Sequence, residues 1–277
     1  MIESIIFFLL VSLACLYLLN LYVGFRLAHR DFSAAYNDAR KLWPARGIYT
    51  AGVAENSITS VRQAFDAGAT GVEIDIFYDV EMADFIVSHD RPYRLVEGKL
   101  LTLKEMFDAL GEEHYFWLDF KKLRKLTRSQ AIQAVSRLAE ITTQHGLRER
   151  VYVEGETPIN LALFRRAGFH TIFDTHPTAD GKLLTPAVIA IYKMVYYFGK
   201  HTVMAMESGS REKPIYGPAT SASLGQVPMF LYHVPQDDPG WQQALIAQPA
   251  VRVLVMGSER YANPGNGPEN GDGGTLT

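Results

Sequence analysis

Short apolar runs alternate with amphipathic stretches through the middle of the chain. Between residues 45 and 261 the apolar runs are GIYTAG, GVEIDIF, DFIVSH, YFWLDFK, RVYVEGE, HTIFDTH, TVMAMES, PMFLYHV and VRVLVMG. Stretches with helical spacing, such as SITSVRQAFDAGA, TLKEMFDAL, RSQAIQAVSRLAEITTQHG and NLALFRRAG, separate most of them. A repeated order of strand and helix predicts an α/β fold with a parallel sheet.

The number of candidate strands favours a closed (β/α)8 TIM barrel. The chain has 277 residues, and a barrel of about 250 residues would use most of them. Nine candidate strands for eight places imply that one run is short or lies outside the barrel, and we expect this of TVMAMES. A doubly wound open sheet is the alternative. Its dinucleotide-binding version lacks support, because no G-x-G-x-x-G follows the first strand.

The two ends of the chain differ from this middle part. Residues 5–25 form an uncharged run that is long enough to span a bilayer as a helix, although a cleaved signal peptide is the alternative. Basic residues lie only after the run, which favours a cytoplasmic globular domain. We expect a single transmembrane anchor at 1–26, a connector at 27–44, the barrel at 45–261 and a disordered tail, rich in Gly, Asn and Pro, at 262–277.

Composition and charge exclude several classes of site and partner. The formal net charge is −3 and the pI is near 6.2, and no basic stripe is interleaved with aromatic residues, so we expect no nucleic-acid partner. The single cysteine, Cys15, lies in the apolar N-terminal run. This excludes disulfides within the chain and cysteine-rich metal sites.

Carboxylates cluster where two apolar runs end. Glu73 and Asp75 are two residues apart on a predicted strand and share a face, as do Asp119 and Lys121. The carboxyl ends of barrel strands meet at the face where barrel enzymes place their chemistry. Glu73, Asp75 and Asp119 therefore suit one hard divalent cation, Ca2+ or Mg2+, with His89 beside them at the end of the next strand. The alternative is a solvated pair or an ion pair with Lys121.

One part of the chain resembles a known family. The stretch ENSITSVRQAFDAGATGVEIDIFYDVEMADFIVSHDRP, followed by LLTLKEMFDAL and YFWLDFK, resembles the glycerophosphodiester phosphodiesterases, a barrel family in the wider phosphatidylinositol phospholipase C-like group. That family's pattern is His-Arg-Gly after the first strand, then Glu-Asn-Thr, Glu-x-Asp, His-Asp and Glu-x-Lys. The matching positions are Glu55 with Asn56, Glu73 with Asp75, His89 with Asp90, and Asp119 with Lys121. From about residue 122 onward only the rhythm of strands and helices agrees.

The resemblance implies a metal-dependent phosphodiesterase that acts on glycerophosphodiesters or lysophospholipids. In that family two histidines exchange the roles of general acid and base across a phosphodiester held on the metal. The resemblance assigns the metal to Glu73, Asp75 and Asp119 and places His89 and Lys121 in the catalytic machinery.

The chain departs from the family at the first strand. Thr50, Ala51 and Gly52 stand where the family has His-Arg-Gly, so one histidine and the phosphate-binding arginine are absent. Losing one acid or base group typically costs about 10²- to 10⁴-fold in rate. His176 and His233, which end predicted strands, are candidates to compensate, and Glu154 and Glu207 are expected at the same mouth.

Three functions therefore stay open. The first is a membrane-anchored, metal-dependent phosphodiesterase. The second is a catalytically impaired barrel of the same family that binds phosphate or lipid, or acts as a scaffold. The third, a lyase or isomerase that uses a metal and Lys121, rests on analogy of fold alone. The carboxylate set favours chemistry, whereas the loss of the first-strand His and Arg favours binding.

Overall fold

The computed structural model describes residues 2–30, 32, 48–50, 56–66, 68–96, 98–111 and 113–256. In these residues eight parallel strands form a ring. They are β1 (Ile48–Thr50), β2 (Gly71–Asp79), β4 (Tyr115–Phe120), β5 (Val151–Gly155), β6 (His170–Asp174), β7 (Val203–Glu207), β8 (Met229–Val234) and β9 (Val251–Met256). Because β1 pairs with both β2 and β9, the sheet closes on itself, as the predicted barrel requires.

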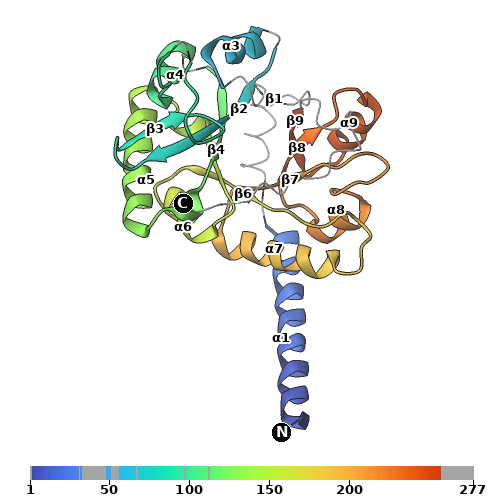
Figure 1. The fold of residues 1–277 in the computed structure, drawn as a ribbon. Coiled ribbons are helices and arrows are strands. Elements are labelled where there is room, and N and C mark those ends of the chain that lie inside the picture. The colour runs from blue at the N-terminus through green and yellow to red at the C-terminus, as the bar shows by residue number, and fades with distance from the viewer. Residues whose placement is uncertain are drawn as a thin grey trace, which may run out of the picture.

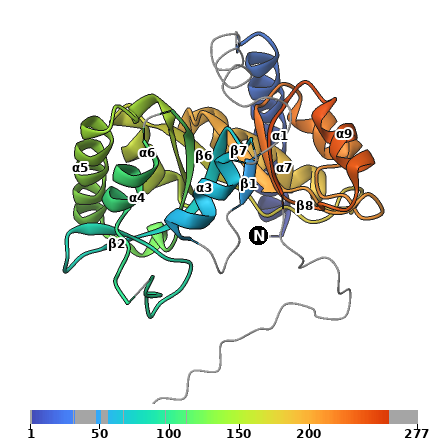
Figure 2. The same ribbon diagram turned by 90° about the horizontal axis from the view of Figure 1, so that it is seen from above.

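Helices follow the strands and surround them (Figures 1 and 2). In chain order they are α3 (Ile58–Asp66), α4 (Leu103–Leu110), α5 (Arg128–Gln144), α6 (Pro158–Arg166), α7 (Thr185–Gly199), α8 (Pro218–Leu224) and α9 (Pro239–Ile246), with short 3-10 helices at Leu123–Lys125 and Arg148–Arg150. The amphipathic stretches of the sequence correspond to α3, α4, α5 and α6. Each lays its apolar side on the barrel, as the alternating pattern predicts.

The expectation about the surplus strand is wrong. TVMAMES forms β7, which pairs with β6 and β8 inside the ring. The surplus strand is β3 (Asp84–Val87), which runs antiparallel to β2 and lies outside the ring. β2 continues past the barrel to Asp79, whose Oδ1 accepts hydrogen bonds from the amides of Glu81 and Met82 at 3.0 and 3.1 Å. This tight turn sends the chain back along β2 instead of into a helix.

Aromatic side chains fill the interior of the barrel. Trp117 of β4, which is fully buried, has its ring 5.4 Å from that of Phe230 of β8. Tyr152 of β5 packs on the same phenyl ring at 5.3 Å. These contacts join strands that are not neighbours in the sheet, so they fix the barrel's cross-section below the mouth.

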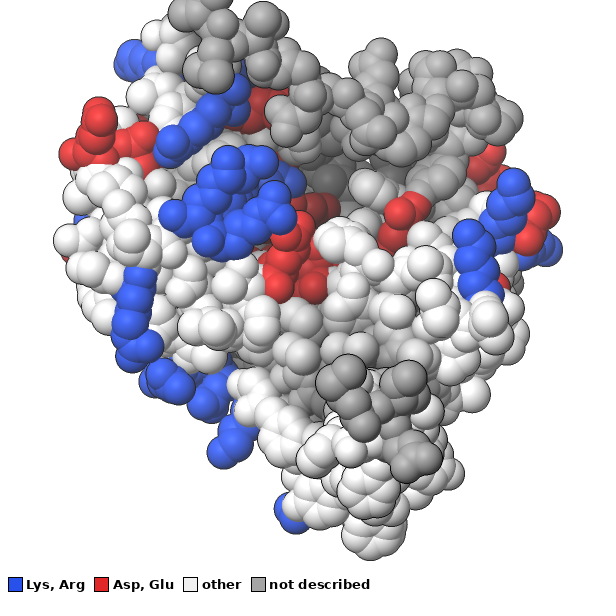
Figure 3. Space-filling view, turned by 60° about the horizontal axis from the view of Figure 1, so that its bottom comes forward, with Lys and Arg blue, Asp and Glu red and all other residues white. Residues whose placement is uncertain are grey.

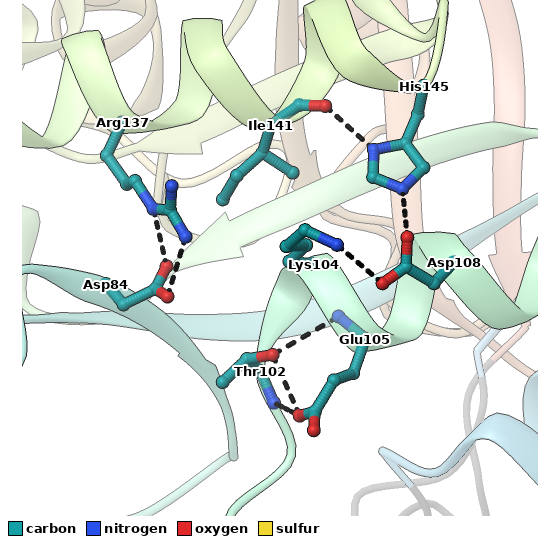
Figure 4. A network of polar contacts seen from close by, with 8 residues as sticks. All are labelled: Asp84, Thr102, Lys104, Glu105, Asp108, Arg137, Ile141 and His145. Atoms are coloured by element: carbon teal, nitrogen blue, oxygen red, sulfur yellow. Dashed lines mark hydrogen bonds and ion pairs between the residues drawn. The ribbon is translucent and has the colours of Figure 1, made fainter.

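The β2–β3 hairpin is fastened to helix α5 by one ion pair (Figure 4). The Arg137 guanidinium donates to both carboxylate oxygens of Asp84, from Nε at 2.9 Å and from Nη2 at 2.8 Å. Both side chains are about four-fifths buried. A two-pronged contact of this kind is strong and directional, so it fixes the hairpin's position over the barrel.

Helix α4 is fixed between the hairpin and α5 (Figure 4). Thr102 and Glu105 form a reciprocal capping box, in which each side chain accepts a hydrogen bond from the other residue's amide. At the other end of α4, Asp108 lies 2.7 Å from the His145 Nε2 at the end of α5. The connection after the hairpin is thus ordered by local polar contacts as well as by packing.

Helix α1 (Ile2–Ala28) precedes the barrel and projects from it (Figure 1). Its segment from Ser4 to Ala28 has a mean hydropathy of 2.4, so by length and composition it is able to cross a membrane, a test that a signal sequence also meets. Only its last turns touch the barrel, where Val23 and Leu27 are buried. Residues 33–44 of the expected connector and the expected tail at 262–277 lie outside the described residues.

We expect Arg137→Ala to lower the free energy of unfolding by about 1 to 2 kcal/mol, because Asp84 would lose its partner while staying mostly buried. For a domain of this size that is a fall in melting temperature of roughly 2 to 8 °C, measurable by circular dichroism. Arg128→Ala on the same helix is the control, since Arg128 is exposed, and it should change stability by less than about 0.5 kcal/mol. Equal effects of the two substitutions would contradict the assignment.

Candidate functional site

A cavity of about 850 Å³ opens where the barrel strands end. Its wall contains all seven residues that the sequence singled out for metal binding or catalysis, Glu73, Asp75, His89, Asp119, Lys121, His176 and His233. It also contains Glu154, whereas Glu207 does not line it. The volume is in the range of small-molecule sites.

Three carboxylates converge in this cavity. Glu73 and Asp75 come from β2 and Asp119 comes from β4, and each offers an oxygen within 4.8 Å of the others. The register of the sheet explains the convergence, because Asp75 pairs directly with Asp119 and Glu73 lies two residues before Asp75 on the same face. The predicted carboxylate set is therefore brought together.

Asn56 holds Asp75 in place. Its Nδ2 donates to Asp75 Oδ2 at 2.6 Å, and its Oδ1 accepts from the Asp75 amide at 3.1 Å. Both residues are buried. This paired contact fixes one oxygen of Asp75 and leaves Oδ1 for other partners, which is a structural role for the Asn of the Glu-Asn pair.

Lys121 lies between two of the carboxylates. Its Nζ is 2.7 Å from Asp75 Oδ1 and also donates to Asp119 Oδ2. The ion pair that the sequence offered as an alternative is thus present, together with the carboxylate cluster. One ammonium offsets one of three carboxylates, so the ionised set keeps a surplus of negative charge.

That surplus perturbs the carboxyl groups. Burial first, and then the charges of Asp75 and Asp119, raise the pKa of Glu73 well above its usual range. Burial raises the pKa of Asp119 to about 6, against the opposing effect of Lys121. Further positive charge is needed to keep Glu73 and Asp119 ionised. Their oxygens are the donors that Ca2+ and Mg2+ prefer, so the residues fit a hard divalent cation.

His89 reaches the cavity by a different route from the expected one. We expected it at the end of a parallel strand, but it follows the antiparallel strand β3. The amide of Ser88 donates to the Asp75 carbonyl at 3.1 Å, which brings the returning chain back to the mouth. The His89 Nδ1 lies 2.9 Å from Asp90 Oδ2, and about a quarter of the side chain is exposed. The imidazole therefore lies at the mouth, partly open to solvent.

A second cluster of polar side chains surrounds His176, which lies on the loop after β6. The His176 Nε2 lies 2.9 Å from Asp174 Oδ2 and 3.5 Å from Glu156 Oε1, and its Nδ1 lies 3.2 Å from the hydroxyl of Tyr232. The hydrogen bond to Asp174 is the main reason that the pKa of His176 rises to about 9. These groups are close enough to share a cation. Because the His176 imidazolium is charged at neutral pH, it already supplies the positive charge that a cation would bring to this cluster.

Glu154, at the end of β5, is buried beside the carboxylate set. It accepts a hydrogen bond from the Trp117 indole, and burial followed by the charges of Asp119 and Asp174 raises its pKa well above the usual range. Sequence reasoning named Glu154 and His176 but missed Asp174 and Tyr232. The spacing of Asp174 and His176, two residues apart at a strand end, repeats that of Glu73 and Asp75 and was a usable signal.

The first-strand position that departs from the resembled family adjoins the cavity. Thr50 pairs with Glu73 in the β1–β2 register. Ala51, Gly52 and Glu55 lie outside the described residues. On β8, His233 has a φ of 52°, an uncommon value for a residue other than glycine, at the point where the strand meets the cavity.

Searches against family models and curated proteins give no match. Solved structures do match. A glycerophosphodiester phosphodiesterase from Thermotoga maritima is 16% identical, with a TM-score of 0.54 over 76% of this chain and 92% of that chain. The chain has the fold of this phosphodiesterase. An Oleispira antarctica phosphodiesterase in complex with the product sn-glycerol-3-phosphate is 11% identical, with a TM-score of 0.55 over 79% and 94% of the two chains. At these identities the likeness establishes the fold alone.

We expect Ca2+, Mg2+ or Mn2+ to raise the melting temperature, because a bound cation would relieve repulsion among the carboxylates in the folded state only. Glu73→Gln together with Asp75→Asn should abolish the rise. Asp90→Asn is the matched control, since it removes a carboxylate of the same cavity that belongs to neither group of possible ligands, and it should keep the rise. The melting temperature is measured by differential scanning calorimetry. If none of the three cations changes it in the unsubstituted protein, this site is ruled out.

Proposed function

We propose that the protein is a metal-dependent phosphodiesterase that hydrolyses glycerophosphodiesters or lysophospholipids and is anchored to a membrane by α1. The main support is the carboxylate set Glu73, Asp75 and Asp119 in the mouth of a barrel with the fold of known phosphodiesterases. A neighbour of the same fold was solved with sn-glycerol-3-phosphate, a product that a glycerophosphodiester would yield.

The charges around the mouth suit an anionic diester beside a cation. A bound divalent ion would polarise a phosphoryl oxygen and offset charge that develops on it. The basic residues on the cavity wall are Arg91, Lys121, Lys122, Arg124 and Lys125. Figure 3 shows acidic side chains gathered beside a group of basic side chains on one face of the molecule. The negative charge of a phosphodiester would pair with the basic side chains. A bound cation would link the same phosphodiester to the carboxylates.

Two imidazoles on the wall supply acid and base. Hydrolysis breaks one P–O bond, so the departing alcohol oxygen needs a proton and the attacking hydroxyl or water must lose one. His176 is charged at neutral pH because of Asp174, which suits a proton donor. We assign His89 as the proton acceptor. It follows β3, whereas His176 follows β6, and the strands β2 and β4 that carry the carboxylate set lie between them in the sheet order. His176 thereby replaces the first-strand histidine that Thr50 cannot replace.

A binding or scaffold role is the second candidate. It is favoured by the first strand, where Thr50 and Ala51 stand in place of the resembled family's His and Arg. A protein of this kind would hold phosphate-bearing ligands on the cation without turnover. Stabilisation by glycerol phosphate without hydrolysis of any diester in the panel below would favour this role over the enzyme.

We expect turnover of a glycerophosphodiester or lysophospholipid in the presence of a divalent cation and its loss on chelation. His89→Ala and His176→Gln should each lower kcat by about 10²- to 10⁴-fold, because each removes a proton-transfer group. Since the imidazolium of His176 loses its proton as pH rises through about 9, activity should fall there, and His176→Gln should remove that limb of the profile.

His29→Gln is the control for these two variants, since His29 directly follows α1 and does not line the cavity. Full activity in both His89→Ala and His176→Gln would overturn the proposed roles. Thr50→His with Ala51→Arg provides a gain-of-function test, because it restores the residues of the resembled family at the strand that adjoins Glu73. Turnover should rise if the mouth keeps that family's arrangement.

We expect the full chain to stay in the membrane fraction through carbonate washing, because a helix of this length and hydropathy resists extraction once it spans the bilayer. Replacing Leu10 and Leu13 by Lys should release the protein, since two charges in the apolar segment make insertion costly. Recovery of an unsubstituted, shortened chain in the soluble fraction would show instead that residues 1–26 are a cleaved signal.

A further inference from the structure

Helix α7 turns a stripe of large apolar side chains to the outside. Leu184 directly precedes Thr185, the first residue of α7. Successive members of the series Leu184, Ile191 and Phe198 are seven residues apart, so their side chains lie on one side of the helix. Their exposed fractions are 68%, 55% and 56%. Leu183, just before them, is 94% exposed. Large apolar residues aligned at this spacing are more than the single exposed ones of an ordinary surface.

No polar side chain interrupts this stripe. Ala187, Val188 and Val195 fall on the same side of the helix by their spacing. The one charged residue of α7, Lys193, is directed inward, where its Nζ donates to the Ser223 carbonyl at 3.1 Å. A helix on the water-facing side of a globular domain normally presents charged and polar residues there, so this side of α7 is not built for water.

The stripe belongs to the helix on which α1 rests. Val23 and Leu27 of α1 are buried, and the ring of Tyr22 meets that of Tyr197 edge-on at 6.3 Å. Figure 1 shows α7 lying crosswise at the C-terminal end of α1, whose remaining length projects away from the barrel. The stripe therefore lies on the helix that contacts the end of α1.

The length of α1 places α7 at a defined level. From Ile2 to Tyr22, before the contact with α7, the helix has about 21 residues and a length of about 31 Å at 1.5 Å per residue. This matches a hydrocarbon core of about 30 Å. Tyr22 and Tyr197 then fall at the membrane–water boundary, where tyrosines are enriched. Lys182 and Lys200, exposed at the two ends of α7, would meet lipid head groups.

We propose that α7 lies flat in the membrane–water boundary, with Leu184, Ile191 and Phe198 inserted among the lipids next to the spanning helix α1. The occupant of the stripe is the bilayer itself. The domain is then not merely tethered by α1 but docked in one orientation, because two crossed helices fix a plane that a single span does not.

Docking in this orientation places the mouth of the barrel beside the lipid surface. The segment between β6 and α7 is one of the loops at the carboxyl ends of the strands, and it carries both His176 and Leu184. If the proposed function holds, a phosphodiester head group can enter the cavity while its acyl chain stays in the bilayer, which favours lysophospholipids over water-soluble diesters.

The test measures contact with lipid at single positions of the full chain. In a Cys15→Ser background, Ile191→Cys, Phe198→Cys and, as the control, Ile132→Cys each carry one spin label in vesicles of phosphatidylcholine and phosphatidylglycerol. Ile132 is 46% exposed and also apolar, and its helix α5 lies away from α1 (Figure 1). We expect the ratio of oxygen to nickel-chelate accessibility to be several-fold higher at 191 and 198 than at 132.

The possible outcomes separate the occupants. Equal accessibility to the nickel chelate at all three positions would show that α7 faces water and would overturn the proposal. Protection of 191 and 198 from both reagents would show that protein covers the stripe, either a second copy or another segment, and would overturn it as well. The measurement needs no enzyme activity, so its failure is distinct from failure of the proposed function. Where turnover is found, Ile191→Asp with Phe198→Asp should slow hydrolysis of vesicle-bound lysophospholipid and leave that of glycerophosphocholine unchanged.

Discussion

Crowding of negative charge at the mouth of the barrel is the constraint on which the rest of the site depends. Carboxyl groups from β2, β4, β5 and β6 meet in one partly buried cavity, where burial and the neighbouring charges raise the pKa values of Glu73, Asp119 and Glu154. The protein offsets part of this charge with Lys121 on one wall and the His176 imidazolium on another. Such a concentration of unfavourable charge destabilises the fold unless a cation or a bound ligand makes use of it. Its presence is therefore itself an argument for a site.

The barrel makes this crowding possible through register. Parallel strands place residues of equal register side by side, so Asp75 and Asp119 face the same centre without any long connection between them. Asn56 then restricts Asp75 by two hydrogen bonds, and the aromatic packing around Trp117 fixes the strands from below. The geometry of the carboxylates follows from the backbone of the ring more than from the loops. His89 and His176, in contrast, lie on the segments that follow β3 and β6.

Much of this could be predicted from the sequence, and the failures have physical reasons. Apolar runs ending in polar residues identify strands, and a two-residue spacing identifies side chains on one face, so the Glu73, Asp75 and Asp119 set was predictable and the structure brings it together. The direction of β3 was not predictable, because a short apolar run has the same pattern in a parallel strand and in a hairpin. The turn at Asp79 decides between the two. Helix α7 lacks a polar side and so gives no amphipathic signal. The pairing of His176 with Asp174 and Tyr232 depends on β6 and β8 closing around one cavity, which no local pattern contains.

The departure at the first strand and the apolar side of α7 have a common consequence. Without the His and Arg of the resembled family next to Glu73, positive charge in the cavity comes instead from Lys121, the basic residues that follow β4, and His176 beyond β6. His176 is the member of this set that lies on the loop before α7, whereas the basic residues that follow β4 precede α5. If the proposed function holds, a substrate phosphate bound at His176 would lie by the loop that joins His176 to Leu184, and the same loop leads into the helix on which α1 rests. An anionic head group and an acyl chain could be bound together there. A water-soluble diester would use only the first of these two features.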